Sequence, residues 1–299
     1  MHRTIFHLHD LPEDKVYVRI EYDFRQKMLS EARIKAGSLV KLGKVLHCYT
    51  STLSRWKTGE SSIPLFILCE ISKFLHKEEF SKLEIEKHTI SVSSGRKSET
   101  NGSVGKPLRM PNFPFKISFK LARIVANMIG DGCINTNHYY TTTYWNKDYY
   151  LLEQLKTCIL DTFGDCDFHE NLGKDNVYYL NIPSIIGMVL ACWFGEFKGD
   201  LAKVPEQIMN GNLLIKRGFL QGLFDDEGTL AVKQKQIKIG VANKQLINGI
   251  RNLLIDLQLT PTNIVTLGYT TRVNKIQRKF YNLSICRGTS ILLFREIIG

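Results

Sequence analysis

Apolar residues recur every three or four positions in several stretches of the chain, which is the spacing of one buried helix face. In the first hundred residues this pattern predicts four helices, over residues 24–35, 39–46, 51–57 and 65–75. Further along it predicts helices over 149–163, 184–194, 245–257 and 290–298. Alternating or β-branched runs predict strands at 16–22, 138–144, 176–182, 229–232, 236–241, 264–269 and 279–285.

Two further apolar helices end in acidic residues, which the helix dipole does not favour. One covers 121–132 and ends in Asp131-Gly132, and the other ends in Asp225-Asp226-Glu227-Gly228. A helix C-terminus carries about half a negative charge, so local electrostatics gives no reason for acids there. Small residues four apart on both helices would let their faces pack closely. If the two helices cross side by side, Asp131 and Glu227 meet at a site that favours a divalent cation.

The segments around these helices form an internal repeat. The two acids lie 96 residues apart, and the Asn146-Lys147 and Asn243-Lys244 pairs lie 97 apart. Each unit reads as helix, two strands, helix, two strands, helix, so the repeat covers roughly 113–299.

The residues 124–132, IVANMIGDG, and 220–228, LQGLFDDEG, resemble the two nine-residue motifs of the LAGLIDADG homing endonucleases. This resemblance implies an α+β fold, a duplicated αββαββα saddle with antiparallel sheets. We expect a helical DNA-binding domain at 1–90, a linker at 91–112, and the two repeats at 113–200 and 201–299.

The resemblance also implies a chemistry, the metal-dependent hydrolysis of both strands of a long DNA target. Asp131 and Glu227 would each ligate Mg²⁺ or another divalent cation, with help from the main-chain carbonyls of Gly130 and Asp226. Lys147 and Lys244 would polarise water or steady the phosphate charge, and Asn146 and Asn243 would orient solvent. An ordinary helix start, with Asn as N-cap, is the other interpretation of these Asn-Lys pairs.

Strand residues on the open face of each sheet would contact the DNA. The candidates in the first repeat are Tyr140, Thr142 and Tyr144. Those in the second are Lys233, Lys235, Lys238, Arg272, Lys275, Arg278 and Lys279. The alternation alone does not say which set faces the DNA, and a solvated charged surface is the other interpretation.

The stretch 38–64 resembles the helix-turn-helix of Cro-type phage repressors. Its apolar residues Leu39, Leu42, Val45, Leu46, Leu53 and Trp56 would form a small core. The DNA-contacting residues would be Thr50, Ser51, Thr52, Ser54, Arg55 and Lys57. A helical bundle used for protein contacts is the alternative.

Composition agrees with a nucleic-acid partner without requiring one. The net charge of +11 and the pI near 9.2 favour an anionic partner. The charge is uneven: residues 113–197 carry 6 basic and 9 acidic side chains, whereas 198–299 carry 15 and 7. The seven cysteines form no CxxC pair, which indicates reduced thiols. The sequence shows neither a signal peptide nor an apolar run of membrane length, so we expect a cytoplasmic, non-membrane protein. We also expect a monomer.

Three functions therefore stay open: a site-specific DNA endonuclease, a transcriptional regulator with a catalytically silent saddle, and, more distantly, an intron RNA maturase. Protein splicing is not expected, because it needs a nucleophile at the first junction and a final His-Asn, whereas this sequence runs from Met1 to Gly299. His2, His7 and His9 lie near the start, but the sequence shows nothing else that completes a metal site with them.

Overall fold

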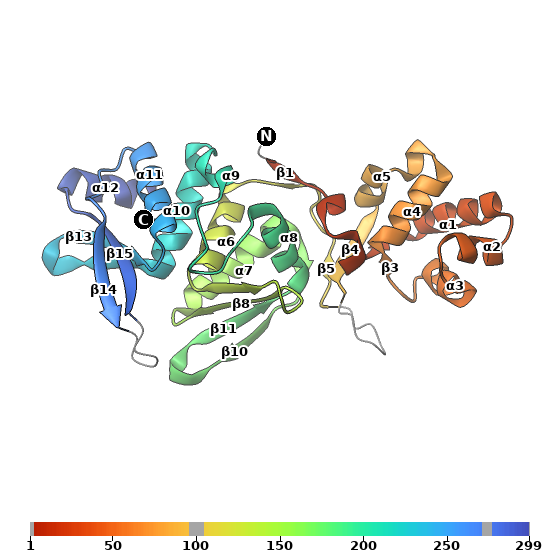
Figure 1. The fold of residues 1–299 in the computed structure, drawn as a ribbon, viewed down its shortest axis with the longest axis horizontal. Helices are drawn as coiled ribbons and strands as arrows, with labels where there is room; N and C mark the ends of the chain where they lie inside the picture. Colours follow the sequence, from red (N-terminus) through yellow and green to blue (C-terminus); the bar gives the residue numbers. More distant parts are fainter. Residues whose placement is uncertain (1–2, 96–104, 271–276, 299) are drawn as a thin grey trace.

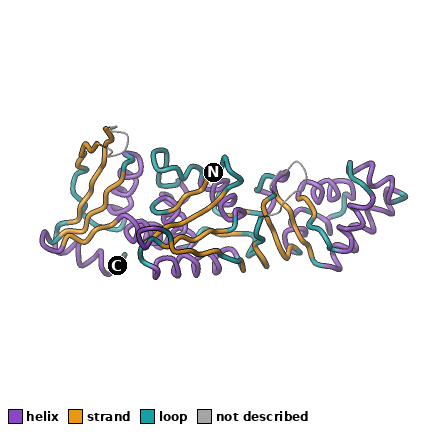
Figure 2. The backbone as a smooth tube through the Cα atoms, turned by 90° about the horizontal axis from the view of Figure 1, so that it is seen from below, coloured by secondary structure: helices purple, strands orange, loops and turns teal. Residues whose placement is uncertain are grey.

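The computed structural model describes residues 3–95, 105–270 and 277–298. Three parts follow one another along the long axis: the N-terminal helices, a middle part with the first repeat, and the second repeat at the far end (Figure 1). Seen from below, each of the three parts contains both strands and helices (Figure 2). Among the helices in the described ranges, none combines the length and the apolar character needed to cross a bilayer.

The N-terminal part consists mainly of short helices. They are α1 (Tyr22–Ala36), α2 (Leu39–Val45), α3 (Thr50–Thr58), α4 (Leu65–Leu75) and α5 (Lys82–Lys87), with the 3₁₀ turns η1 (Leu8–Asp10), η2 (Glu13–Lys15) and η3 (Glu78–Phe80). Helix α1 ends at Gly37, whose φ of 84° a residue without Cβ adopts freely. The Ser38 side chain then caps α2 by accepting a hydrogen bond from the Lys41 amide.

Helices α2 and α3 are packed on a small apolar core, as the sequence predicts, with one exception. Leu42, Leu46, Leu53 and Trp56 are buried, and Leu39 is partly buried against them. Val45 was predicted in this core, but it is 48% exposed. It lies at the last position of α2.

A five-stranded sheet in the order β3-β2-β4-β5-β9 connects the N-terminal helices to the first repeat. Its strands are β2 (Val16–Ile20), β3 (Ile63–Pro64), β4 (Thr89–Ser94), β5 (Leu108–Arg109) and β9 (Asp165–Cys166). Strands β4 and β5 lie within or beside the stretch predicted as a linker, and β9 belongs to the first repeat. A two-stranded ladder adds a second connection, between β1 (Ile5–Phe6) and β6 (Phe115–Lys116).

Each repeat contains a four-stranded antiparallel sheet with helices, so the predicted α+β class is confirmed. The first sheet has the order β10-β11-β8-β7 and uses β7 (Gly132–Asn135), β8 (Thr141–Asn146), β10 (His169–Leu172) and β11 (Tyr178–Ile182). The second has the order β12-β13-β15-β14 and uses β12 (Gly228–Ala231), β13 (Gln236–Val241), β14 (Val265–Thr270) and β15 (Gln277–Ile285). The helices are α6 (Phe119–Ile129), α7 (Tyr149–Phe163) and α8 (Ser184–Phe194), then α9 (Glu206–Met209), α10 (Leu213–Glu227), α11 (Lys244–Asp256) and α12 (Gly288–Ile297), with η4 (Lys174–Asn176) and η5 (Val232–Gln234) between strands.

Candidate active site

Helices α6 and α10 pack against each other where the two repeats meet, and small residues make the contact close. A Cβ atom added to Gly218 would lie 2.4 Å from the main-chain oxygen of Phe119. One added to Gly222 would lie 2.8 Å from the main-chain oxygen of Arg123. The backbones therefore approach at a distance that larger side chains would prevent, which brings the C-terminal ends of both helices together. We call this contact the helix seam.

Asp131 comes next after Gly130, the C-cap of α6, and Glu227 is the last residue of α10, so both lie at the end of the seam. Burial raises the pKa of Asp131 above its ordinary value. Burial also raises the pKa of Glu227, and the negative charge of Asp131 raises it further. The structure thus brings the two predicted acids into electrostatic contact. Among the ion pairs of the described residues, none compensates either carboxylate.

Asp226 takes part in the seam through its side chain, whereas the sequence assigned it only a main-chain carbonyl. Its Oδ2 accepts a hydrogen bond of 3.0 Å from Asn127 Nδ2, and its Oδ1 accepts one of 2.6 Å from the Tyr144 hydroxyl. Burial is the main reason that its pKa rises to about 7, and the charge of Asp131 adds to the rise. Gly130 leaves room for this carboxylate, because a Cβ there would lie 2.7 Å from Asp226 Oδ2.

The third acid of the motif, Asp225, is neutralised within the seam. Its Oδ2 lies 2.6 Å from Arg123 Nη2, and the same guanidinium nitrogen donates to the Gln154 side chain. Burial raises the pKa of Asp225, and the charge of Arg123 opposes that rise. The acids of the second motif therefore have different surroundings: Asp225 is paired with a base, Asp226 is held by neutral donors, and Glu227 is subject to the negative charge of Asp131.

The two Asn-Lys pairs are not equivalent in the structure. Asn146 Nδ2 donates a 2.9 Å hydrogen bond to Asp131 Oδ2, so it lies at the site. Asn243 instead caps α11 through its Oδ1, while its Nδ2 donates to the carbonyl oxygen of Ala202 at 2.5 Å. The role predicted for Asn243, orienting solvent at the site, does not fit these contacts, because the amide is buried and fully used. Lys147 and Lys244 are both exposed.

Glu227 lines an open hollow of about 860 Å³ together with basic residues that the sequence did not single out for catalysis. Lys198 comes from the loop after the first repeat, and Lys279 from β15. Asp200 and Gly130 also line it. The hollow therefore holds two carboxylates, those of Asp200 and Glu227, and two ammonium groups, those of Lys198 and Lys279.

In the first sheet, Thr142 and Tyr144 were predicted to contact DNA, but both lie on the buried face of β8. Thr142 and Tyr144 are 1% and 0% exposed, because their side of β8 packs against the helices. Gly187 of α8 makes room for Thr142, whose hydroxyl donates to the main-chain oxygen of Tyr140. Tyr140 is half-buried in the turn before β8. The alternate residues, Thr141, Thr143 and Trp145, lie on the other face, since successive strand residues point to opposite sides.

In the second sheet, the described candidates lie where DNA could reach them. Lys233 and Lys235 are exposed next to β13, and Lys238 lies on the side of β13 opposite the buried Ile239 and Val241. Lys279 is exposed on β15. Arg272 and Lys275 lie outside the described residues, as does the side chain of Arg278.

On α3 the polar and apolar residues separate as the sequence predicts. Thr50, Ser51, Ser54 and Arg55 are exposed, while Thr52 and Lys57 are half-buried. The Ser54 hydroxyl donates to the main-chain oxygen of Thr50, and Arg55 lies 3.9 Å from a carboxylate oxygen of Glu60. The exposed face of this helix is therefore free for a partner.

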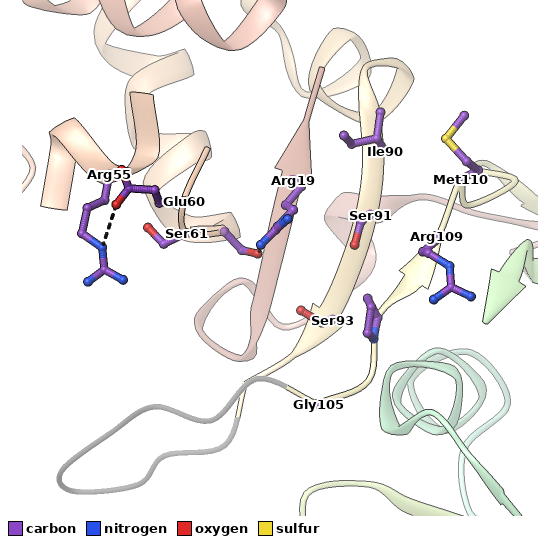
Figure 3. Close-up of a pocket in the computed structure, with 12 residues that line it drawn as sticks. Arg19, Arg55, Glu60, Ser61, Ile90, Ser91, Ser93, Gly105, Arg109 and Met110 are labelled. Atoms are coloured by element: carbon purple, nitrogen blue, oxygen red, sulfur yellow. Dashed lines mark hydrogen bonds and ion pairs between the residues drawn. The ribbon is translucent and has the colours of Figure 1, made fainter. Parts of the chain in front are cut away.

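A basic hollow of about 700 Å³ next to α3 was not predicted (Figure 3). Arg19 on β2, Ser91 on β4 and Arg109 on β5 are direct neighbours across the five-stranded sheet. Arg55 lines the same hollow from α3. No sequence signal joins these residues, because the strands that carry them are distant in the chain. Arg109 also binds Asp165 and Asp167 of the first repeat, each at 2.7 Å.

Comparison with known proteins identifies part of the chain. Residues 215–299 match the LAGLIDADG-like domain. Among curated proteins, a glutamine–fructose-6-phosphate aminotransferase of Methanocaldococcus jannaschii is 28% identical over 205 residues, which are 64% of this chain and 17% of that protein. The chain spans less than a fifth of the length of the curated relatives that it matches.

Two solved structures resemble part of this chain. The homing endonuclease I-DmoI in complex with DNA and Mn is 18% identical, with a TM-score of 0.42 over 62% of this chain and 98% of that one. Full-length DUF199/WhiA from Thermatoga maritima is 16% identical, with a TM-score of 0.42 over 63% of this chain and 58% of that one.

Proposed function

We propose that this chain, of which residues 215–299 match the LAGLIDADG-like domain, is a site-specific DNA-binding protein of the homing endonuclease type, which hydrolyses both strands of a long target. The observation that carries the proposal is the convergence of Asp131 and Glu227 at the end of the helix seam. Burial makes both carboxylates costlier to ionise, and the charge of Asp131 adds to this cost for Glu227. Neither has a basic partner among the ion pairs of the described residues, so a bound cation would relieve the cost.

The donor set at the seam fits Mg²⁺ or a similar hard divalent cation, since such ions prefer carboxylate and carbonyl oxygens. Asp131 and Glu227 would hold the cations, and the main-chain carbonyls of Gly130 and Asp226 remain proposed helpers. Such cations supply positive charge next to the scissile phosphate and make water a better nucleophile. Asp226 would position the ends of both helices, because its carboxylate is occupied by Asn127 and Tyr144.

Basic and polar residues around the seam would handle the phosphate and the water. Asn146 holds Asp131 through a hydrogen bond and so fixes the direction of that carboxylate. Lys198 and Lys279 line the hollow that contains Glu227, where they would stabilise phosphate charge. Lys147 and Lys244 keep the supporting role proposed from the sequence, with side chains that are exposed and able to swing toward a bound duplex.

Double-stranded DNA would run along the side of the molecule that carries the two repeat sheets and α3, the lower side in Figure 1. The hollow lined by Arg19, Arg55 and Arg109 lies between α3 and the first repeat. Arg109 is paired with two aspartates and Arg55 lies near Glu60, so Arg19 is the arginine of this hollow that would offer its charge to the duplex. A helix-turn-helix made by α2 and α3 would add contacts at one flank of the target. One chain supplies both halves of the seam, so a monomer suffices.

A transcriptional regulator with a silent saddle is the second candidate, and the unequal Asn residues favour it. Asn146 supports Asp131, but the buried amide of Asn243 gives Glu227 no matching support. An enzyme that cuts both strands needs two competent half-sites, whereas a regulator needs only binding. The acids of the seam weigh against this candidate, because uncompensated carboxylates repel DNA phosphates.

One experiment separates the two candidates. The binding site of the purified protein is selected from random duplexes, and the selected duplex is incubated with Mg²⁺ and wild type, Asp131→Asn or Glu227→Gln. The endonuclease proposal predicts double-strand cleavage by the wild type and loss of cleavage, with binding retained, in both variants. Tight binding without cleavage by the wild type would assign the protein to the regulators.

A further inference from the structure

His7, His9 and Glu86 converge at a second place, outside the candidate active site, where the chain brings together residues 79 positions apart. Each residue offers a ligand atom, and these atoms all lie within 4.8 Å of one another. His7 Nδ1 is 3.0 Å from Glu86 Oε1. In a tetrahedral zinc site with bonds of about 2.0–2.2 Å, neighbouring ligand atoms lie about 3.3 Å apart. The sequence showed the two histidines but not the carboxylate that joins them.

We propose that His7, His9 and Glu86 bind a transition-metal ion of the Zn²⁺ class. Imidazole nitrogens with one carboxylate select such ions over Mg²⁺ or Ca²⁺, which prefer oxygen ligands alone. The cluster therefore differs in chemistry from the carboxylates of the seam.

The local hydrogen bonds leave these ligand atoms in place and available. Glu86 has a side chain that is only 5% exposed, and its Oε2 accepts a 2.5 Å hydrogen bond from the Leu8 amide. This contact fixes the carboxylate and directs Oε1 toward His7. Such an outer hydrogen bond orients a metal-ligating carboxylate.

His9 gives a second, independent observation in favour of a metal ion at this cluster. Its Nδ1 is buried and has no hydrogen-bond partner in the described part of the chain, although its ring stacks on His7 with centroids 4.9 Å apart. An ion pair between His7 and Glu86 would explain those two residues alone. A shared metal ion explains why a second histidine with an unsatisfied ring nitrogen lies beside them.

The fourth coordination position is assigned to solvent. Asp10, the nearest other carboxylate in sequence, is occupied: it lies 2.6 Å from Arg3 Nη1 and accepts a 2.7 Å hydrogen bond from the His7 amide. The His7 side chain is 30% exposed, which gives an ion and its water a path to the site.

The site would join two parts of the molecule. The segment before His7 belongs with the first repeat, since β1 pairs with β6 and the Trp193 indole donates to the Arg3 carbonyl at 3.0 Å. Glu86 lies on α5, among the N-terminal helices. A metal ion at the cluster would therefore hold the N-terminal helices against the first repeat and fix the spacing between the two DNA-contacting regions.

Cobalt serves as a spectroscopic probe for the test. Metal-stripped protein is titrated with Co²⁺ in an Asp131→Ala/Glu227→Ala background, so that the seam does not contribute. We expect one Co²⁺ per chain, displaced by Zn²⁺, with visible ligand-field bands and without the strong near-ultraviolet band of a cobalt–thiolate bond. His9→Asn removes a direct ligand and should weaken binding by more than the roughly 10–100-fold that loss of an outer hydrogen-bond partner costs. His76→Asn, at an exposed helix end, should leave binding unchanged.

Two results would overturn the proposal. One is the absence of saturable Co²⁺ binding. The other is binding that persists in both His9→Asn and Glu86→Gln. Zinc-edge X-ray absorption on the wild type keeps the test independent of variant folding: a shell of imidazole nitrogen and oxygen supports the site, and sulfur in the shell contradicts it.

Discussion

The Tyr144 hydroxyl donates a 2.6 Å hydrogen bond to Asp226 Oδ1, and this contact joins the two repeats. Tyr144 belongs to β8 of the first repeat and is fully buried, whereas Asp226 lies in the last turn of α10 in the second. The bond fixes the end of α10 against the first sheet. Glu227, the next residue, is thereby held at the end of the seam, facing the hollow.

Removing the Tyr144 hydroxyl should destabilise the protein. Tyr144→Phe leaves a buried carboxyl group without one of its donors, so we expect the free energy of unfolding to fall by about 1–3 kcal/mol. Urea unfolding followed by circular dichroism measures the change. Tyr150→Phe is the matched control, because Tyr150 is 64% exposed. Equal stability of both variants would show that the bond contributes nothing.

The pKa of Asp226, raised by burial from 3.8 to about 7, predicts a pH dependence of stability in the metal-free protein. Below about pH 3.8 the folded and unfolded chains are both protonated at this residue. As pH rises toward 7 the unfolded chain ionises first, so the unfolding free energy falls and then levels off above 7. Unfolding in EDTA across pH 4–8 measures this slope, and Asp226→Asn should flatten it. Parallel wild-type and variant curves would contradict the assignment.

The close approach of α6 and α10 predicts that the seam does not tolerate a methyl group. Gly218→Ala would place a Cβ 2.4 Å from the Phe119 oxygen, so the helices must separate. Overpacking of this kind costs about 1–3 kcal/mol. Gly288→Ala is the control, since no neighbouring atom lies within 4 Å of its added Cβ. Thermal unfolding compares the two, and a stable Gly218→Ala protein would mean that the helices are not in contact.

Because the polar face of α3 is exposed, we expect the removal of a DNA-contacting side chain from this face to weaken DNA binding specifically. If Arg55 contacts a base edge in the selected target, Arg55→Ala should weaken binding by about 1–3 kcal/mol. Arg33→Ala, an exposed residue of α1, removes the same charge away from α3. Fluorescence anisotropy at fixed salt measures both. Equal losses would indicate that only net charge matters, and the helix-turn-helix proposal would lose its support.

Local patterns predicted the elements better than the contacts. The helices over 65–75, 149–163 and 184–194 have the expected bounds, because the apolar period and the flanking residues define a helix locally. The face of β8 could not be predicted in this way, since Thr141 and Thr142 differ only in which side packs on α8. Strand β10, with the polar sequence HENL, gives no apolar alternation, and it was missed.

Contacts between distant residues were the least predictable part of the site. The pairing of Asp131 with Glu227 could be expected because a repeat places them at equivalent positions. The Asp226 side chain and Glu86 could not, because nothing in the sequence relates Asp226 to Tyr144 or Glu86 to His7. Such contacts arise from tertiary packing, and the periodicity of apolar residues along the chain carries no information about them.

The most direct test of the account is Mn²⁺ binding to the protein–DNA complex, measured by electron paramagnetic resonance. A His9→Asn background keeps the second cluster from contributing. The account predicts saturable Mn²⁺ binding that Asp131→Asn or Glu227→Gln each abolishes, whereas Asp226→Asn retains it. Unchanged Mn²⁺ binding in both Asp131→Asn and Glu227→Gln would contradict the claim that these two carboxylates hold the cations.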